Sequence, residues 1–443
     1  MSIIGTVART FQSILGPRLD AIGRQTGAIR RQRKFTGASL FKTLVLTVMK
    51  APNAKTDAYV ATAARLGVIV TAEAIKKRFN ERLIPFLREG LEHVTEHVVR
   101  ADPVAIPLLE KFSAVEIGDS TTITLPDQYA DEFPGCGGKS ASGQAAVKIQ
   151  ATWELRTGKL KDLEFQPGRH SDAKSLAPDA PAPPGSLKIY DLGYFSLQRF
   201  RRWDSAGVSW ISRLQPGTVV CDADGAPLDL LPYVRAHQGG VPIDIPILLG
   251  SVERVGCRMI VLRVPQEVGD RRRQKAYERA QKHGSVPSAD QLAWCDWTIL
   301  VTSVPPALLT WKEVVVMYRS RWQIELMFKL WKSHNQLATD RETRPAVERM
   351  ALFWAKLIGV ILQHWLLLMS TWSNPRRSHW KAAAVIQETV VSLTVALNDI
   401  TALIAVLEGM TTTIKAVDDK KLQKKSPSWF QLLRNPELLN WGF

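Results

Sequence analysis

One segment of fifteen residues, Tyr318 to Lys332, gathers side chains that could act on a phosphate group. In an α-helix at about 100° per residue, one face of the segment would carry a carboxylate, three cations and a phenol within about 80° of arc, from Tyr318, Arg321, Glu325, Lys329 and Lys332. The opposite face would be apolar and ready for a core, with Ile324, Met327, Leu330 and Trp331. Taken alone, the polar face also fits ordinary i,i+4 ion pairs on a wet surface, each contributing a few tenths of a kcal/mol.

Two aspartates elsewhere in the chain could complete a metal site with Glu325. Alternating apolar residues predict a strand from Val115 that ends at Asp119, and a second from Leu187 that ends at Asp191. A single aspartate at a strand end is more often a turn residue. Three carboxylates from two strand ends and an abutting helix, however, could hold two Mg²⁺ ions about 4 Å apart, because Mg²⁺ prefers hard oxygen ligands. The set predicts phosphoryl transfer, with the neighbouring cations holding phosphates of the scissile strand.

The strands and helices expected around these residues indicate a multidomain α/β protein with a mixed β-sheet flanked by helices. A hairpin is expected from residues 145–155 and 160–165, with its turn at Thr157-Gly158. A helix at 196–205 and a strand at 208–214 follow the second aspartate. Residues 215–296 are predicted to be a mostly β insertion with a basic helical segment at 271–282, because the strand at 297–303 leads straight into the segment that carries Glu325.

Both ends of the chain are predicted to be helical. Between Arg9 and Lys55 ten cations face one acid, Asp20, and the densest cluster is Arg30, Arg31, Arg33 and Lys34. This one-sided balance favours a DNA-contacting region, although a charge run is usually a solvated face and no sequence-specific DNA-binding motif is evident in it. The expected organisation is a basic DNA-binding region at 1–110, a catalytic domain in two parts at 111–214 and 297–372, the insertion at 215–296, and a C-terminal region at 373–443 that could serve dimerisation.

Composition narrows the class of partner. A net charge of +16 and an isoelectric point near 9.7 favour a polyanion, either nucleic acid or an anionic membrane surface. A membrane span is not expected, because Lys356, Gln363 and His364 interrupt the most apolar stretch, 350–369, which fits a buried helix better. The four cysteines show neither metal-binding nor disulfide spacing, and the N-terminus does not resemble a secretory signal, so the cytoplasm is the expected compartment.

The spacing Tyr318-x2-Arg321-x3-Glu325-x6-Lys332 resembles the Y-R-E-K signature of cut-and-paste transposases from bacterial insertion sequences, the DDE type with a ribonuclease-H-like catalytic domain. The resemblance extends from about residue 113 to 335. It implies that Asp119, Asp191 and Glu325 are the catalytic carboxylates and the ligands of a two-metal Mg²⁺ site in which Mn²⁺ can substitute. Leu192 departs from the family, many members of which have Arg after the second aspartate, so a local contact differs.

The resemblance also implies an activity and its partners. One strand is nicked at each end of the element, the freed 3′-hydroxyl forms a hairpin on the opposite strand, water reopens the hairpin, and the 3′-hydroxyl attacks target DNA. The partners would be double-stranded DNA, as terminal inverted repeats and target, and a second copy of the chain in a synaptic homodimer in the bacterial cytoplasm. Contacts with DNA would come from Tyr318, Arg321, Lys329 and Lys332. Trp297 would stack on a flipped base, although a Trp at the start of an apolar strand is more often a core residue.

Three other functions fit parts of the sequence. The first is a transposase-derived DNA-binding protein that no longer cuts, against which the three retained carboxylates argue. The second is a ribonuclease-H-like nuclease without strand transfer, against which Trp297 and Tyr318 argue. The third is an unrelated basic α/β enzyme such as a glycosidase that uses two carboxylates, which metal-independent glycan turnover would favour.

Overall fold

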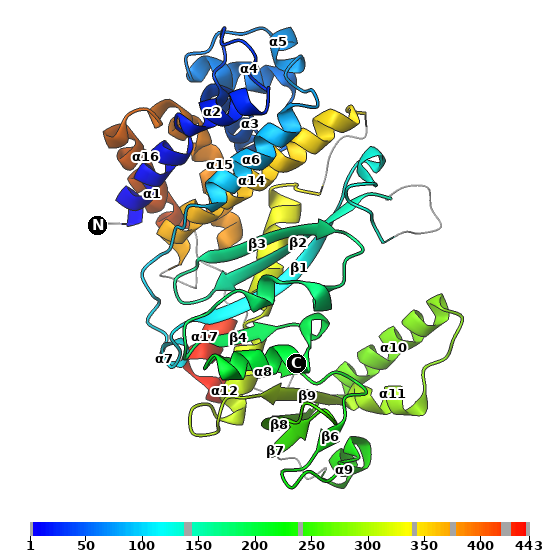
Figure 1. Cartoon of the computed structure of the whole chain (residues 1–443). Coiled ribbons are helices and arrows are strands. Elements are labelled where there is room, and N and C mark those ends of the chain that lie inside the picture. The colour runs from blue at the N-terminus through cyan, green and yellow to red at the C-terminus, as the bar shows by residue number, and fades with distance from the viewer. Residues whose placement is uncertain are drawn as a thin grey trace.

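A computed structural model of the chain describes residues 3–136, 144–237, 242–338, 343–372, 378–417 and 427–439. Within these residues the molecule has two parts, a single nine-stranded sheet with its covering helices and a bundle of helices above it in the view of Figure 1. The protein is therefore a mixed α/β protein with helical N- and C-terminal regions, as the sequence predicts.

The sheet has the strand order β3-β2-β1-β4-β5-β9-β8-β7-β6. Strands β1, β4 and β5 are parallel, and all other neighbours are antiparallel. The predicted hairpin is confirmed as β2 and β3, with Gly158 at φ +71° in its turn, a left-handed conformation that glycine adopts without strain. The strand bounds are β1 Val115–Thr124, β2 Ala146–Glu154, β3 Leu160–Pro167, β4 Leu187–Tyr190, β5 Ser209–Arg213, β6 Val220–Cys221, β7 Ile243–Leu249, β8 Val255–Arg263 and β9 Trp297–Thr302.

The residues expected to form an insertion extend the same sheet. Strands β6, β7 and β8 follow β9 in strand order, and β9 joins them to β5 of the first half. The helices of this stretch are α9 (Leu230–Ala236), α10 (Gln266–Lys282) and α11 (Ala289–Ala293). Helix α10 projects from the edge of the molecule in Figure 1 and buries only Gly269 of its own residues, so most of its basic side chains lie outside a core.

Alternation along the strands gives the sheet two buried faces. Ile117 and Ile189 belong to one apolar core, whereas Tyr190 and Trp210 belong to a second. Helix α8 (Leu197–Ser205), whose Ser196 hydroxyl accepts a hydrogen bond from the Arg199 N–H at its N-terminus, packs into the second core. Because successive side chains of a strand point to opposite faces, Asp191 lies on the same side as Ile189, and Asp119 on the same side as Ile117.

The two ends of the chain form one helical bundle. Helix α14 packs against α3 and α6, α15 packs against α3, and α1 packs against α16. The bundle thus combines residues expected to lie in three different regions, at 1–110, 297–372 and 373–443. Its helices are α1 Ile3–Ile14, α2 Arg18–Gln25, α3 Gly37–Lys50, α4 Thr56–Arg65, α5 Ala72–Lys76, α6 Leu83–Thr95, α14 Ala346–Thr371, α15 His379–Ala396 and α16 Ile400–Val417.

Helix α14 links the bundle to the sheet through its polar residues. The Lys356 ammonium donates to the Gln336 carbonyl, Gln363 pairs with Asn335, and a ring nitrogen of His364 bonds to the Gly158 carbonyl in the turn between β2 and β3. By length and apolarity α14 and α16 could each cross a membrane, but the apolar window of α14 is wholly buried within the protein. The buried helix expected at 350–369 is therefore confirmed, and burial holds the His364 pKa down at about 4.

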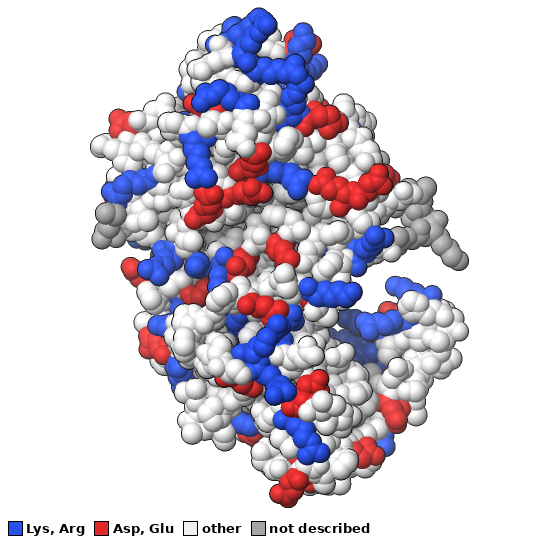
Figure 2. All heavy atoms as spheres, in the orientation of Figure 1, with Lys and Arg blue, Asp and Glu red and all other residues white. Residues whose placement is uncertain are grey.

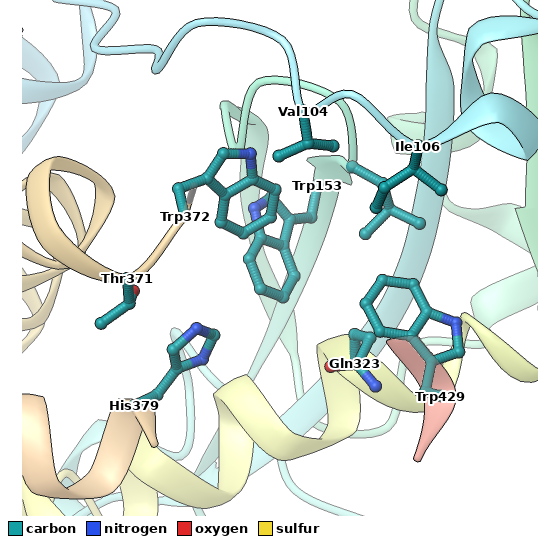
Figure 3. A pocket seen from close by; sticks show the side chains of 9 residues that line it. Val104, Ile106, Trp153, Gln323, Thr371, Trp372, His379 and Trp429 are labelled. Carbon is teal, nitrogen blue, oxygen red and sulfur yellow. The ribbon is translucent and has the colours of Figure 1, made fainter. Parts of the chain in front are cut away.

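The last described helix returns to the sheet. Helix α17 (Trp429–Arg434) packs against α7 (Pro107–Glu110) and α12 (Trp311–Arg319). Trp429 closes a small cavity of about 40 Å³ between the bundle and the sheet, opposite Trp153 and Trp372 and beside Gln323 (Figure 3). Five segments far apart in sequence meet there, so the C-terminal region expected at 373–443 contributes to both parts of the molecule.

Candidate active site

The pairing of β1 with β4 sets the two aspartates side by side. These strands run parallel, and the last paired residues are Gly118 and Tyr190. Asp119 and Asp191 each come next. The expectation that Asp119 ends its strand is wrong, because β1 continues to Thr124 on its other partner, the long antiparallel strand β2. Asp191 does follow the end of β4. Asp119 therefore lies within β1, beside the point at which β4 ends.

Gly118 leaves room for the ring of Tyr190 to pack across β1. A Cβ atom at this position would lie 1.9 Å from Cε1 of the Tyr190 ring, well inside van der Waals contact. The Tyr190 hydroxyl in turn forms a hydrogen bond of 3.1 Å with the Thr152 hydroxyl on β2. The ring therefore crosses β1 on the face opposite the aspartates and ties three strands together beneath them.

The third carboxylate lies on a broken helix, which corrects the single helix expected from Tyr318 to Lys332. Helix α12 ends at Arg319, α13 covers Trp322–Lys329, and Leu330–His334 form a turn of π-helix. At the break the Ser320 hydroxyl donates to the Met317 carbonyl, and the Arg321 N–H donates to the Tyr318 carbonyl, so the chain tightens to i→i+3 bonds. The apolar side, from Ile324 to Trp331, is buried as expected.

The guanidinium of Arg321 lies among all three carboxylates. Its Nη1 is 3.1 Å from Oδ2 of Asp119, its Nη2 is 2.6 Å from Oε1 of Glu325, and its Nε is 3.8 Å from Oδ1 of Asp191. Arg321 is 16% exposed, so the pair with Glu325 is not a wet surface pair. The fold thus brings together Asp119, Asp191 and Glu325, which are far apart in sequence, around one cation.

These carboxylates are of the ligand type that suits a hard divalent ion, and all three surround the guanidinium of Arg321. No group of three His, Cys, Asp or Glu side chains in the described part of the chain is close enough to hold a metal ion. Oxygen-only donors on two strands and a helix are the ligands that Mg²⁺ and Mn²⁺ prefer. An ion held by all three carboxylates would take the place that the Arg321 guanidinium holds in this structure.

Burial makes Asp119 unusual among these carboxylates. Burial raises the pKa of its carboxyl to about 6, and the charges of Asp191 and Glu325 also raise it, against the Ser120 N–H and Arg321, which lower it. The folded protein therefore holds a proton on Asp119 more tightly than the unfolded chain does. Ionisation of Asp119 therefore costs more free energy in the folded protein than in the unfolded chain, and a bound cation would lower that cost.

Asp119→Asn is expected to stabilise the protein above pH 6. Because the folded pKa is above the usual 3.8, the contribution of this carboxyl to stability is full below about pH 4 and is lost as pH rises through 6. The loss is about 3 kcal/mol for a shift of about two pKa units. Urea unfolding from pH 4 to 8 should show that decline in the wild type and a flatter profile in the variant. Asp290→Asn, at an exposed site, is the control, and parallel profiles for wild type and Asp119→Asn would contradict the assignment.

Tyr318 lies beside the same carboxylates. Burial and the charge of Asp191 raise the pKa of its phenol to about 12, so the group is neutral and can donate a hydrogen bond. No described residue forms a well-aligned hydrogen bond with the Tyr318 hydroxyl, and the same holds for the Nε of Arg321. The Tyr318 hydroxyl lies beside the Arg321 guanidinium, and the Arg321 Nε faces Asp191 at 3.8 Å, so the phenol keeps its capacity to donate to an acceptor in the site.

The other residues singled out from sequence lie apart from the carboxylates. Lys329 is exposed on α13, and Lys332 is half-buried in the π-helical turn, where burial lowers its pKa. Neither forms an ion pair with the three carboxylates among the described residues. Trp297 is 9% exposed in the second core, on the other side of the sheet, where it lines a cleft of about 150 Å³ with Trp294.

The basic cluster near the N-terminus forms a loop between α2 and α3. Ile29 and Phe35 are buried and anchor the two ends of the loop, and between them the cations Arg30, Arg31, Arg33 and Lys34 are exposed. Lys and Arg side chains gather at the end of the bundle that holds α2, α4 and α5, far from β9 in this view (Figures 1 and 2). Two short helices, α4 and α5, flank Gly67 further along the chain.

Sequence reasoning missed three cations near the site. A cleft of about 700 Å³ adjoins Tyr318 and Arg321, and Arg213, Arg272 and Arg319 also line it. They come from β5, α10 and α12, so no local spacing connects them. The only sequence signal was the basic run at 271–282, which does not reveal which of its cations faces inward.

A protein-family model and several known proteins resemble this chain, and all of them are described as transposases. Residues 112–358 match the family model described as "Transposase DDE domain". The "Transposase for insertion sequence element IS231C" of Bacillus thuringiensis subsp. berliner is 27% identical over 344 residues, 72% of this chain and 70% of that protein. The "Transposase for insertion sequence element IS1151" of Clostridium perfringens is 25% identical, over 67% of this chain and 66% of that protein. The "Putative transposase InsL for insertion sequence element IS186A" of Escherichia coli (strain K12) is 25% identical, over 78% of this chain and 89% of that protein.

Proposed function

Because this chain belongs to the DDE transposase family of bacterial insertion sequences, we propose that it cuts DNA at the ends of its own element and joins them to a target. The observation that carries the proposal is the convergence of Asp119, Asp191 and Glu325 on one cation, Arg321, within the matched domain. The order β3-β2-β1-β4-β5, with the aspartates on adjacent parallel strands, supports a ribonuclease-H-like core.

The three carboxylates are proposed to hold Mg²⁺, for which Mn²⁺ would substitute. When bound, the ions would stabilise the negative charge that develops on the phosphate during strand cleavage and strand transfer. The rise in the Asp119 pKa supports this role. Burial disfavours the charged form of this carboxyl, and a bound cation would stabilise that form. Protons compete for the same oxygen atoms, so metal binding should weaken as pH falls below about 6.

Arg321 and Tyr318 are proposed to bind the DNA backbone. A guanidinium fork binds phosphate as it binds carboxylate, so a phosphate could take over Arg321 once bound metal neutralises the three carboxylates. The buried Tyr318 hydroxyl would donate to a phosphate oxygen and would not act as a nucleophile. Lys329, Lys332 and the loop cations Arg30, Arg31, Arg33 and Lys34 are proposed to contact DNA further away.

The finer steps and partners follow from the same proposal. Nicking, hairpin formation, hairpin opening and strand transfer would take place in turn at the one set of carboxylates. Trp297 would stack on a base flipped from the hairpin at the separate cleft that it lines beside Trp294. Two copies of the chain would bring two ends together in the cytoplasm. We assign residues 1–110 to DNA binding, 111–214 and 297–372 to catalysis, 215–296 to an insertion within the catalytic domain, and part of 373–443 to dimerisation.

The test of this proposal is an assay of the purified protein on a labelled duplex that carries the ends of its own element, with and without Mg²⁺. Metal-dependent cleavage with a hairpin product is expected. Affinity should fall by orders of magnitude between about 50 and 200 mM salt, because several phosphate contacts release counterions. Tight, salt-dependent binding without cleavage would instead support the inactive DNA-binding descendant, and cleavage without hairpins or strand transfer would support a simple nuclease.

Tyr318→Phe should weaken cleavage without abolishing it. The loss of one hydrogen bond to a charged acceptor costs about 1.5–3 kcal/mol, which corresponds to a fall of roughly ten- to a hundredfold in rate. Single-turnover cleavage of the end duplex measures the effect, and Tyr277→Phe, on the exposed surface of α10, is the control. Complete loss of cleavage with unchanged DNA binding would show that the hydroxyl does more than contact a phosphate.

A further inference from the structure

The cleft beside the candidate active site is lined by cations from several elements. Its arginines are Arg213 at the end of β5, Arg272 on α10, Arg319 on α12 and Arg321, and none of its lining residues is an acid. The surface is hollowed beside the lobe that carries α10 and α11, with Lys and Arg side chains along the hollow (Figure 2). The cleft is therefore suited to a polyanion that reaches the three carboxylates.

Arg272 is built into the wall of this cleft. Its Nη1 donates to the Trp297 carbonyl at 2.8 Å, and its Nη2 donates to the Thr298 hydroxyl at 2.9 Å, which fixes the guanidinium plane against β9. Its hydrogen bonds go to two carbonyls and a hydroxyl, and within the described ranges no acid lies at ion-pair distance from it. Burial, and then the charge of Arg213, hold its pKa below the ordinary value.

The neighbours of Arg272 on α10 show that this placement is specific. Arg271 is exposed, and its Nε donates to the Glu267 carbonyl of the same helix. Arg273 is neutralised by Asp270 and Asp296, at 2.7 Å each. Three consecutive arginines thus have three different environments, and only Arg272 lines the cleft.

Arg213 completes a pair of like charges. It lies at the exposed end of β5, lines both this cleft and the smaller one beside Trp297, and forms no ion pair with any residue that the structure describes. It is close enough to Arg272 for its charge to disfavour the charged form of that side chain. Two adjacent guanidinium groups without a counter-ion are stabilised by a shared anion, and two planar forks suit the oxygens of a phosphate.

We propose that Arg213 and Arg272 together bind one backbone phosphate of the element-end DNA, separate from the phosphate that is cut. The proposal rests on the proposed function. Phosphate contacts fix the register of a protein on a duplex, and here the contact would come from α10 of the inserted stretch and β5 of the first half of the sheet. The insertion would therefore help to set which bond of the DNA lies at the three carboxylates.

The test compares Arg213→Gln and Arg272→Gln with Arg271→Gln, which removes the same charge one residue away on α10. Binding of the end duplex is measured by fluorescence anisotropy over a range of salt concentration. The first two variants should lower the slope of log affinity against log salt by about 1, and Arg271→Gln should leave it nearly unchanged. Equal effects of all three would show a diffuse electrostatic contribution and would overturn the proposal.

A second measurement identifies the phosphate. Duplexes with a single neutral methylphosphonate linkage are scanned along the end sequence, and one position should weaken wild-type binding several-fold but leave Arg213→Gln and Arg272→Gln unaffected. Additive losses at every position would contradict the shared site. Arg213→Gln breaks no described contact, so it is decisive even if Arg272→Gln, which loses bonds to β9, unfolds.

Failure of the proposed function and failure of the phosphate site give different results. If the wild type neither prefers its end duplex nor cuts it with Mg²⁺, the proposed function is wrong. If the wild type cuts its ends but Arg213→Gln and Arg272→Gln cut at the same bond and bind as Arg271→Gln does, only the phosphate site is wrong. Shifted cleavage positions in the first two variants would be the direct sign of a lost register contact.

Discussion

Glu325→Gln is expected to lower end cleavage by at least about a thousandfold while DNA binding changes by only a few-fold. The substitution keeps the size of the side chain but removes one of three charges, and charge stabilisation of this kind contributes several kcal/mol to transition-state binding. Each 1.36 kcal/mol corresponds to a factor of about ten in rate. Single-turnover cleavage and anisotropy on the same labelled duplex separate the two effects.

The chain offers a matched control for that experiment. Glu348 forms the same type of i,i+4 ion pair, with Arg344, and is 27% exposed against 29% for Glu325, but it belongs to α14. Glu348→Gln should therefore cleave as the wild type does. Undiminished cleavage by Glu325→Gln would exclude this carboxylate from catalysis, and equal losses in both variants would indicate damage to folding.

Arg321→Gln is expected to lower cleavage by about a hundredfold or more and, without DNA, to make the protein depend on metal for its stability. The guanidinium is the only cation bonded to the three carboxylates in the described structure. Its loss removes an interaction that lowers the Asp119 pKa, so that pKa should rise above about 6. The resulting destabilisation is small at pH 5, where Asp119 is protonated, and grows as pH rises to 8.

Metal should then reverse the effect in the variant more than in the wild type. In Arg321→Gln the space between the carboxylates is free for Mg²⁺, and ligand binding raises Tm by mass action. In the wild type the ion must first displace the guanidinium, so the Tm gain at pH 7.5 should be smaller. Arg344→Gln is the control, because Arg344 is buried to a similar extent and also forms an i,i+4 ion pair, with Glu348. If Mg²⁺ raises the Tm of the wild type but leaves the Tm of Arg321→Gln unchanged, this account of Arg321 is wrong.

Local patterns in the sequence predicted much of the fold correctly. The hairpin of β2 and β3, helix α8 and the buried helix α14 all follow from short-range periodicity and turn residues, which depend on neighbours within a few positions. Two local expectations were wrong for a physical reason. Strand β1 passes Asp119 because β2 pairs with it further along, and the helix with Glu325 breaks at Ser320, where side-chain and backbone bonds tighten one turn.

What the sequence determined by itself is the set of reacting groups and their family. The residue types and spacing from Tyr318 to Lys332, with two aspartates after apolar strand residues, predicted a DDE transposase, which the family match confirms. Spacing carries this information because the functional group of a side chain is set by its residue type, although its pKa depends on where the fold places it.

Only the tertiary structure decided which charges meet. Arg321 lies among carboxylates that are 130 and 202 residues away as well as beside Glu325, Arg272 lines the cleft while Arg271 faces solvent, and both chain ends join one bundle. These contacts depend on the register of β1 with β4, on the turn at Ser320 and on the side of α10 that faces β9. Such features are set by packing between segments remote in sequence, where long-range pairing and burial override any local pattern.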